Sequence, residues 1–237
     1  MRKTTWIAMV AVGLTLIGVS VEAQRYYGRG STDNALRFRV GLFTPDGESD
    51  YWLDNEAVFG GEGDDFEDII LGADFRFALG SRLGLMLSGD FYEGDEDLAY
   101  LDFEDSRGAD IVHNTQLDIS SLTAGLVFNL TPAGAPVVPY LGAGGGVYFW
   151  TLSETGDFID FGDPLGPTIF TGGFEDDGEA LGWYLLAGLE VPLGTQWSLF
   201  AEGRWHSVED EMSGDFVGFG DLDLSGRQIS AGASWRF

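Results

Sequence analysis

The chain has 237 residues, no Cys, and 39 acidic against 12 basic residues, which gives a formal charge of −27 at pH 7. The absence of Cys excludes a disulfide framework and thiolate chemistry. No nucleic acid is expected as a partner, because nucleic-acid binding depends on neutralising phosphates with basic groups.

The first 23 residues have the pattern of an export signal. Arg2 and Lys3 precede an apolar run over residues 6–19, and the run is followed by Val21, Glu22 and Ala23. A basic start, a short apolar core and a small-residue cleavage site are typical of a secretory signal peptide. The run is short for a transmembrane helix, which makes an uncleaved anchor the weaker alternative. We expect export through the general secretory route and cleavage after Ala23.

Downstream of this signal, the sequence predicts a single all-β domain. Residues 24–35 form a polar periplasmic leader, and residues 36–237 form a series of segments in which apolar and polar residues alternate. Strand side chains alternate between two faces, so each segment has one apolar and one polar face. The eight predicted strands are 36–42, 69–79, 83–91, 117–130, 138–150, 181–191, 197–207 and 222–237.

The fourth predicted strand changes phase along its length. Leu117 and Ile119 share one parity, whereas Leu122 and the apolar residues after it share the other. A β-bulge near residues 120–121 accounts for such a change. A membrane boundary at the same point is the alternative.

Glycines line one face of the fifth predicted strand. Gly142, Gly144 and Gly146 share the inward parity, and we expect them to leave room for long side chains opposite. A phosphate-binding glycine loop is not predicted, because no helix follows this run.

The connections between strands alternate strictly between short and long. The short turns are 80–82, 131–137 and 192–196. The long connections and their edges hold 32 of the 39 acidic residues. Short turns on one side and long loops on the other are typical of outer-membrane barrels. The pattern predicts an eight-stranded antiparallel up-and-down transmembrane β-barrel, with short periplasmic turns and long acidic extracellular loops.

The last predicted strand carries this signature most clearly. Ile229, Trp235 and Phe237 share the apolar parity, and Arg236 has the polar one. With the run Pro139–Gly146, this pattern resembles the eight-stranded outer-membrane barrels of the OmpA, OmpX and OmpW type. The resemblance implies a Gram-negative outer membrane, with lipids and lipopolysaccharide as neighbours. It also implies that the three apolar residues signal to the barrel-assembly machinery. We expect a monomer that has no cofactor.

The inward face predicts an ion-pair network. Lone buried charges are costly, whereas paired charges are tolerated, and an eight-stranded barrel is only wide enough for side chains to fill. We therefore expect Arg37, Arg39 and Arg236 to lie near Asp74 and Glu202 and the lumen to be plugged. The predicted network comprises Arg37, Arg39, Asp74, Arg76, Asp90, Glu190, Glu202, Arg204 and Arg236.

Two levels of aromatic residues are predicted on the lipid face, because aromatic side chains concentrate at membrane interfaces. A soluble lipocalin-like barrel is the alternative, but it would leave five arginines outside. The level near the short turns comprises Phe77, Phe128, Trp197, Trp235 and Phe237. The level near the long loops comprises Phe91, Phe149, Trp183 and Trp205.

The two histidines suggest little chemistry. Some barrels of this type are lipid A deacylases, and His206, Ser207 and Glu209 raise the same possibility. Adjacent residues point to opposite faces of a strand, however, so His206 and Ser207 do not form a base–nucleophile pair. No catalytic residue and no enzyme activity is predicted. His113 is expected to be exposed and inert.

Acidic clusters in the long connections are candidates for weak Ca²⁺ or Mg²⁺ binding, because these ions prefer oxygen ligands. None has the spacing of a twelve-residue calcium loop, and a solvated acidic surface is the favoured interpretation. The weak candidates are Asp64, Asp65, Asp95, Asp97, Asp176 and Asp177.

Together these patterns predict an integral outer-membrane barrel with a structural or surface-interaction role through its acidic loops. A narrow pore or transporter of small solutes is the first alternative. A lipid-modifying hydrolase is the second.

Overall fold

The computed structural model describes residues 34–132, 135–162, 164 and 166–237. All of them belong to the second of two units into which the chain divides, residues 32–237. The expected signal peptide, its cleavage site and nearly all of the 24–35 leader lie outside the described residues.

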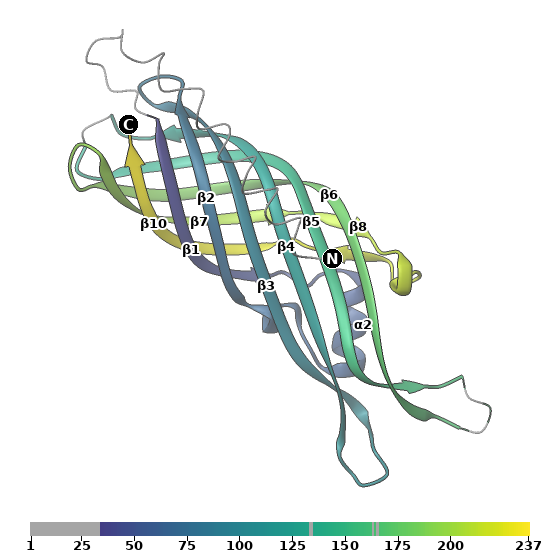
Figure 1. Ribbon diagram of the computed structural model, residues 1–237. Helices are drawn as coiled ribbons and strands as arrows, with labels where there is room; N and C mark the ends of the chain where they lie inside the picture. The colour runs from purple at the N-terminus through teal and green to yellow at the C-terminus, as the bar shows by residue number, and fades with distance from the viewer. Residues whose placement is uncertain (1–33, 133–134, 163, 165) are drawn as a thin grey trace. The chain divides into compact units, whose positions relative to one another are not determined.

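Eight long antiparallel strands close into a barrel in the order β1-β10-β7-β6-β5-β4-β3-β2 (Figure 1). This confirms the predicted fold class. The strands are β1 (Ala35–Pro45), β2 (Asp68–Ala78), β3 (Leu83–Glu104), β4 (Asp110–Asn129), β5 (Val138–Asp160), β6 (Thr168–Pro192), β7 (Trp197–Ser207) and β10 (Gly226–Arg236). The long connections hold α2 (Asp50–Phe59), η1 (Gly63–Phe66), η2 (Gly214–Phe216) and the small sheet of β8 (Glu209–Glu211) and β9 (Asp221–Asp223).

Four strands extend far beyond their predicted ends. β3, β4, β5 and β6 have 20 to 25 residues, so most of the predicted loops 92–116 and 151–180 are strand. They form two long hairpins that project beyond the rest of the barrel (Figure 1).

The expectation of a β-bulge in β4 is wrong. The register runs without a shift through Ser120 and Ser121, which pair with Phe91 and Asp90 of β3. Leu117 lies on the inward face, as the alternation requires. The change of phase follows instead from a change in the environment outside the barrel, which is lipid on one side of this point and water on the other.

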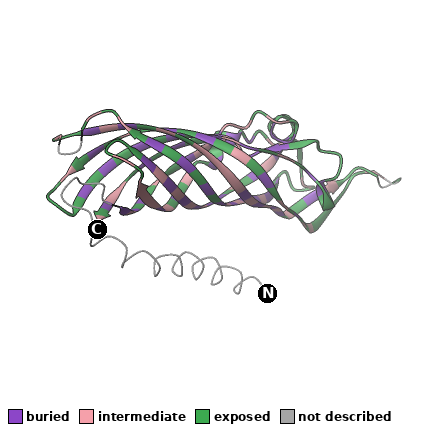
Figure 2. Ribbon diagram, turned by 90° about the horizontal axis from the view of Figure 1, so that it is seen from above, coloured by how far each residue is buried: buried purple, intermediate pink, exposed green. Residues whose placement is uncertain are grey.

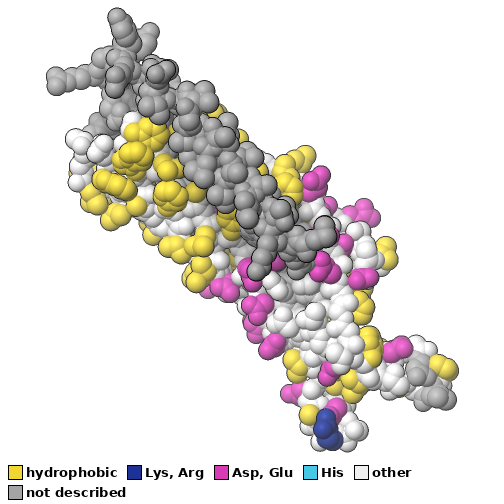
Figure 3. Space-filling view, in the orientation of Figure 1, with side chains coloured by type: hydrophobic (Ala, Val, Ile, Leu, Met, Phe, Trp, Pro, Cys, Tyr) yellow, Lys and Arg dark blue, Asp and Glu magenta, His cyan; other side chains and the backbone are white. Residues whose placement is uncertain are grey.

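That change occurs at one level around the barrel wall. The outward side chains of Leu83–Phe91 on β3 are apolar, apart from one glycine, whereas the next outward residue is Glu93. The pairing places Ser120 and Phe149 level with the end of the apolar run and Asp118 beside Glu93. The apolar run matches the 9–11 residues of a transmembrane β-strand. Figure 3 shows the same division between apolar and acidic surface. We call the two parts the membrane half and the long-loop half.

The interior changes in the opposite sense at this level. In the membrane half the inward side chains are largely polar, whereas in the long-loop half they form an apolar core around Trp52 of α2, which is 1% exposed. The long-loop half is therefore built like a water-soluble barrel, with apolar residues inside and charges outside. Figure 2 shows buried and exposed positions alternating along the strands. Among the described residues, no helix has the length and hydropathy needed to cross a bilayer.

Candidate functional site

The interior of the membrane half is filled by three guanidinium and three carboxylate groups. Arg37 and Asp74 face each other across β1 and β2, where they are register partners, and their side chains are 3.7 Å apart. Arg37 also pairs with Glu202 of β7 at 3.1 Å. Arg39 pairs with both Asp74 and Asp90.

Arg204 of β7 completes this network. It pairs with Glu202 at 2.5 Å, with Asp74 at 3.1 Å and with Asp90 at 3.6 Å. Each of the six side chains is at most 5% exposed. The lumen network is defined by these six groups, Arg37, Arg39, Asp74, Asp90, Glu202 and Arg204.

Neutral side chains close the space around the lumen network. The Tyr140 hydroxyl accepts a hydrogen bond from Arg37 at 2.8 Å and donates one to Glu202 at 2.9 Å. The Arg37 guanidinium lies 3.8 Å from the ring centroid of Phe200, a cation–π contact. Such contacts hold the charged groups in place from two strands, β5 and β7.

Glycines in β4 and β5 make the space for another large inward side chain. A Cβ on Gly144 would lie 2.7 Å from the hydroxyl of Tyr184, and one on Gly125 would lie 2.4 Å from it. Gly144 therefore faces inward and leaves room for a long side chain, as its parity predicts.

The remaining predicted network residues form a separate group near the short turns. Arg236 pairs with Glu190 at 2.7 Å, and Arg76 lies 3.8 Å from the same carboxylate. Arg236 was expected near Asp74 and Glu202, and this expectation is wrong. The pairing of Arg236 with Ala35, at the start of β1, sets it at the end of the barrel.

His206 belongs to the interior, above the lumen network. Its Nδ1 lies 3.0 Å from the Tyr148 hydroxyl, and its Nε2 lies 3.2 Å from Oε1 of Gln228. Ser207 lies on the opposite face of β7, and Glu209 is exposed. The structure does not bring the three candidate hydrolase residues together.

The helix α2 closes the barrel at the long-loop end. Nε1 of Trp52 donates a hydrogen bond to the carbonyl of Asp223 at 3.0 Å, and the Tyr51 hydroxyl donates to Oε1 of Glu154 at 2.7 Å. Burial raises the pKa of Glu154. The sequence did not predict this helix, because α2 is short and lies within an acidic connection.

His113 is buried, so the expectation that its side chain is exposed is wrong. It is 1% exposed, and neither ring nitrogen has a hydrogen-bond partner among the described residues. The extension of β4 places it on the inward face, opposite Leu98. Burial lowers the pKa of His113 to about 4.

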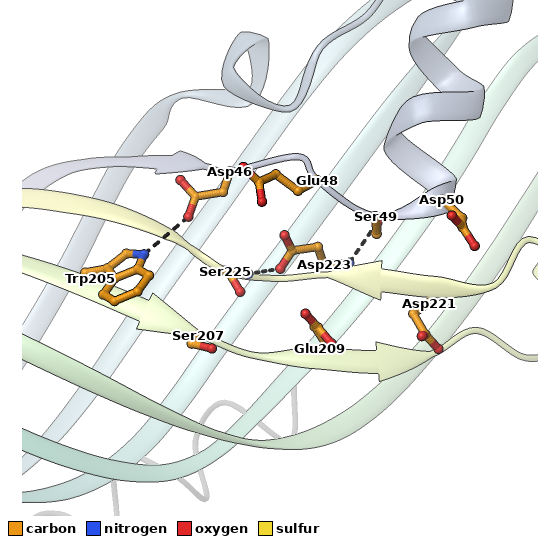
Figure 4. Close-up of a pocket in the computed structure, with 10 residues that line it drawn as sticks. All are labelled: Asp46, Glu48, Ser49, Asp50, Trp205, Ser207, Glu209, Asp221, Asp223 and Ser225. Atoms are coloured by element: carbon orange, nitrogen blue, oxygen red, sulfur yellow. Dashed lines mark hydrogen bonds between the residues drawn. The ribbon is translucent and has the colours of Figure 1, made fainter.

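An acidic pocket of about 360 Å³ lies on the outside of the barrel, beside Trp205 (Figure 4). Nε1 of Trp205 donates to Asp46 at 3.4 Å, and Arg227 pairs with Asp46 at 3.4 Å. The carboxylates around it come from two long connections, the one that follows β1 and the one that follows β7. They are Asp46, Glu48, Asp50, Glu209, Asp221 and Asp223.

The weak metal candidates are dispersed. Asp176 accepts hydrogen bonds from Ser213, and Asp65 accepts one from the backbone of Glu62. Asp97 accepts one from Asn114. Asp64, Asp95 and Asp177 are exposed. Within the described part of the chain, no three acidic or histidine side chains are grouped so that they could hold a metal ion.

The aromatic residues of the two predicted levels lie on the outward face. Trp183 and Trp205 are in ring contact at 5.4 Å near the long-loop half, and Trp235 and Phe237 are in contact at 5.0 Å near the short turns. Five of the nine are prominently exposed, namely Phe128, Trp183, Trp197, Trp205 and Trp235. Phe77, Phe91, Phe149 and Phe237 are half-buried. Ile229, the third residue of the expected assembly signal, is 76% exposed.

Comparisons with known proteins give a family and a fold. The family model for the outer membrane protein beta-barrel domain matches residues 10–237. Neisserial surface protein A is similar in structure, with 12% sequence identity and a TM-score of 0.52, over 87% of this chain and 98% of that one. Outer membrane protein OprG from Pseudomonas aeruginosa has 14% identity and a TM-score of 0.48, over 89% and 98% of the two chains. No curated protein matches the sequence.

Proposed function

Because the chain belongs to the outer-membrane β-barrel protein family, we propose that it is a closed barrel that conducts no solute and acts through its acidic extracellular half. The family is one of the bacterial outer membrane. The long-loop half is then extracellular, and the short turns face the periplasm.

The lumen network is the observation that carries this proposal. It joins β1, β2, β3 and β7 across the interior, with Arg37 and Arg204 completely buried. An ion or solute would have to break several charge-assisted hydrogen bonds to pass. The apolar core around α2 fills the extracellular half as a second barrier.

The acidic surface supports an interaction role. Outward positions of the extracellular half carry Glu93 and Asp95 on β3, Asp118 on β4 and Asp177 on β6. Like charges at this density favour cationic partners and repel anionic ones. We propose a structural or binding role without catalysis, in line with the separation of His206 from Ser207 and Glu209. Lipid A from cells that express the protein should keep all its acyl chains.

Recording from planar bilayers tests the closed lumen. The folded protein, identified by its altered electrophoretic mobility without boiling, should give no steady conductance. The double variant Arg37→Ser/Glu202→Ser removes the ion pair between these two residues, together with the pairs that Arg37 forms with Asp74 and that Glu202 forms with Arg204. It should therefore increase ion flow. Steady channels from the wild-type protein would overturn the proposal in favour of a narrow pore.

A further inference from the structure

The tips of the two long extracellular hairpins expose apolar side chains. Leu101 and Phe103, at the end of β3, are 61% and 41% exposed. Phe161, after β5, and Phe170 of β6 are 57% and 40% exposed. The rings of Phe103 and Phe161 are in contact at 5.2 Å, so the two hairpins meet there. We call these four residues the tip patch.

A buried aromatic cluster holds the tip patch in shape. The His113 ring lies 4.4 Å from Phe59 of α2 and 5.0 Å from Phe158 of β5, measured between ring centroids. Phe59 is also in contact with Tyr100 at 4.7 Å. The cluster joins both hairpins to the helix, and it lies directly beneath the exposed residues: Tyr100 is in contact with Phe103. The surface is therefore organised before any partner binds.

Carboxylates surround the tip patch on both hairpins. Arg107 is the one basic side chain among the described residues of the tips, and it is paired with Asp105 at 3.0 Å. Figure 3 shows hydrophobic and acidic side chains close together at the hairpin tips. The acidic residues are Asp102, Glu104, Asp105, Asp110, Asp157 and Asp160.

The tip patch lies too far along the barrel wall to be in contact with lipid. The patch lies beyond the row of Glu93 and Asp118 that ends the lipid face. A second copy of the chain would bring a formal charge of −27 against the same acidic rim, and a surface of anionic lipid is repelled in the same way. Apolar residues rimmed by charges of one sign fit a partner that presents apolar residues with the opposite charge.

We propose that the tip patch binds a basic amphipathic segment of a partner polypeptide, with its apolar face on Phe103 and Phe161 and its Lys or Arg side chains on the carboxylate rim. This inference rests on the proposed function of the acidic half and names the class of partner.

Binding of synthetic peptides to the protein in phosphatidylcholine nanodiscs tests this inference. The first probe is a helical Leu/Lys peptide with one apolar and one basic face. The second replaces each Leu by Ser, and the third replaces each Lys by Glu. Empty nanodiscs give the background from lipid. We expect the Leu/Lys peptide to bind at least about tenfold more tightly than either of the others, because aromatic anchors dominate such interfaces.

Substitutions at the surface locate the binding. Phe103→Ser/Phe161→Ser should weaken binding of the Leu/Lys peptide by about tenfold. The matched control is Phe219→Ser, because Phe219 is 45% exposed in the fourth long connection, which lies apart from the two tips (Figure 1). This variant should bind like the wild type, and both proteins should keep the electrophoretic mobility of the folded barrel.

Each contrary outcome has its own meaning. Equal binding of the Leu/Lys and Ser/Lys peptides, or equal weakening by Phe219→Ser, would overturn the tip patch and leave the acidic surface as the working site. Failure of both basic peptides to bind above the nanodisc background would overturn the interaction role as well.

Discussion

Arg37 and Glu202 form an ion pair of 3.1 Å inside the barrel, although 165 positions separate them in the chain. Both side chains are completely buried, and Tyr140 is hydrogen-bonded to each of them. The pair is formed only when β1 and β7 have closed into the same barrel. It therefore links the stability of the lumen network to closure of the sheet.

Glu202→Gln should lower the free energy of unfolding by about 3–5 kcal/mol, because it leaves Arg37 and Arg204 with one charged partner fewer in a buried site. Urea unfolding in lipid vesicles, followed by tryptophan fluorescence, measures the change. Arg107→Gln is the control, since Arg107 is 86% exposed and an exposed pair contributes about 1 kcal/mol or less. Equal effects of the two substitutions would contradict the proposed importance of the buried network.

His113 should make the two long hairpins sensitive to acid. Its pKa is about 4 in the folded protein, below the value of about 6.5 of a free imidazole, so the unfolded hairpins bind the proton more tightly. Neutral His113 makes its full contribution to the free energy of unfolding above about pH 6.5. This contribution is lost as the pH falls towards 4, which lowers the free energy of unfolding by up to about 3 kcal/mol. Hydrogen exchange of residues 98–113 at pH 4.5 and pH 7.5 measures the loss.

His113→Phe is the matched variant for this measurement, because it keeps a ring among Phe59, Tyr100 and Phe158 and cannot take up a proton. It should remove most of the pH dependence. Carboxylates titrate in the same range, but they are common to both proteins. An unchanged pH dependence in the variant would show that His113 is not the group responsible.

Gly144→Val should destabilise the membrane half by at least about 1–3 kcal/mol, because a Cβ at this position would lie 2.5 Å from the Ala124 carbonyl oxygen and 2.7 Å from the Tyr184 hydroxyl. The midpoint of urea unfolding measures the effect. Gly80→Ala, at a turn where a Cβ meets nothing within 4 Å, should leave the midpoint nearly unchanged. A Gly144→Val protein as stable as the wild type would mean that the interior is not close-packed there.

The membrane half could be predicted from the sequence because its surroundings impose one simple rule. Lipid selects apolar residues at every second position, as at Leu122, Leu126 and Phe128, and the narrow interior requires that charges such as Arg39 and Asp74 pair. Which charges pair was less predictable, since this depends on strand register. Arg236 joins Glu190 for that reason.

The long-loop half was harder to predict, because water replaces lipid outside the barrel there, so that apolar residues mark the inward face instead of the outward one. Leu117 and Ile119 point inward, whereas outward positions carry acids that have low strand propensity, such as Glu93 and Asp95. The sequence therefore looked like solvated loops. The burial of His113 and the position of α2 depend on the extensions of β3 to β6. These extensions could not be recognised because the segments that form them are rich in acidic residues.

The central claim is that lipid covers the outward face of the barrel only up to one level of its wall. Cysteine labelling tests this claim most directly, because the wild-type chain has no Cys. Leu126→Cys and Asp95→Cys both place a thiol on the outward face, and Leu126 is 50% exposed in the protein alone. In intact cells, a charged, impermeant maleimide should label Asp95→Cys rapidly and leave Leu126→Cys unlabelled, while both react after unfolding in detergent. Equal labelling of the two positions in intact cells would contradict the account.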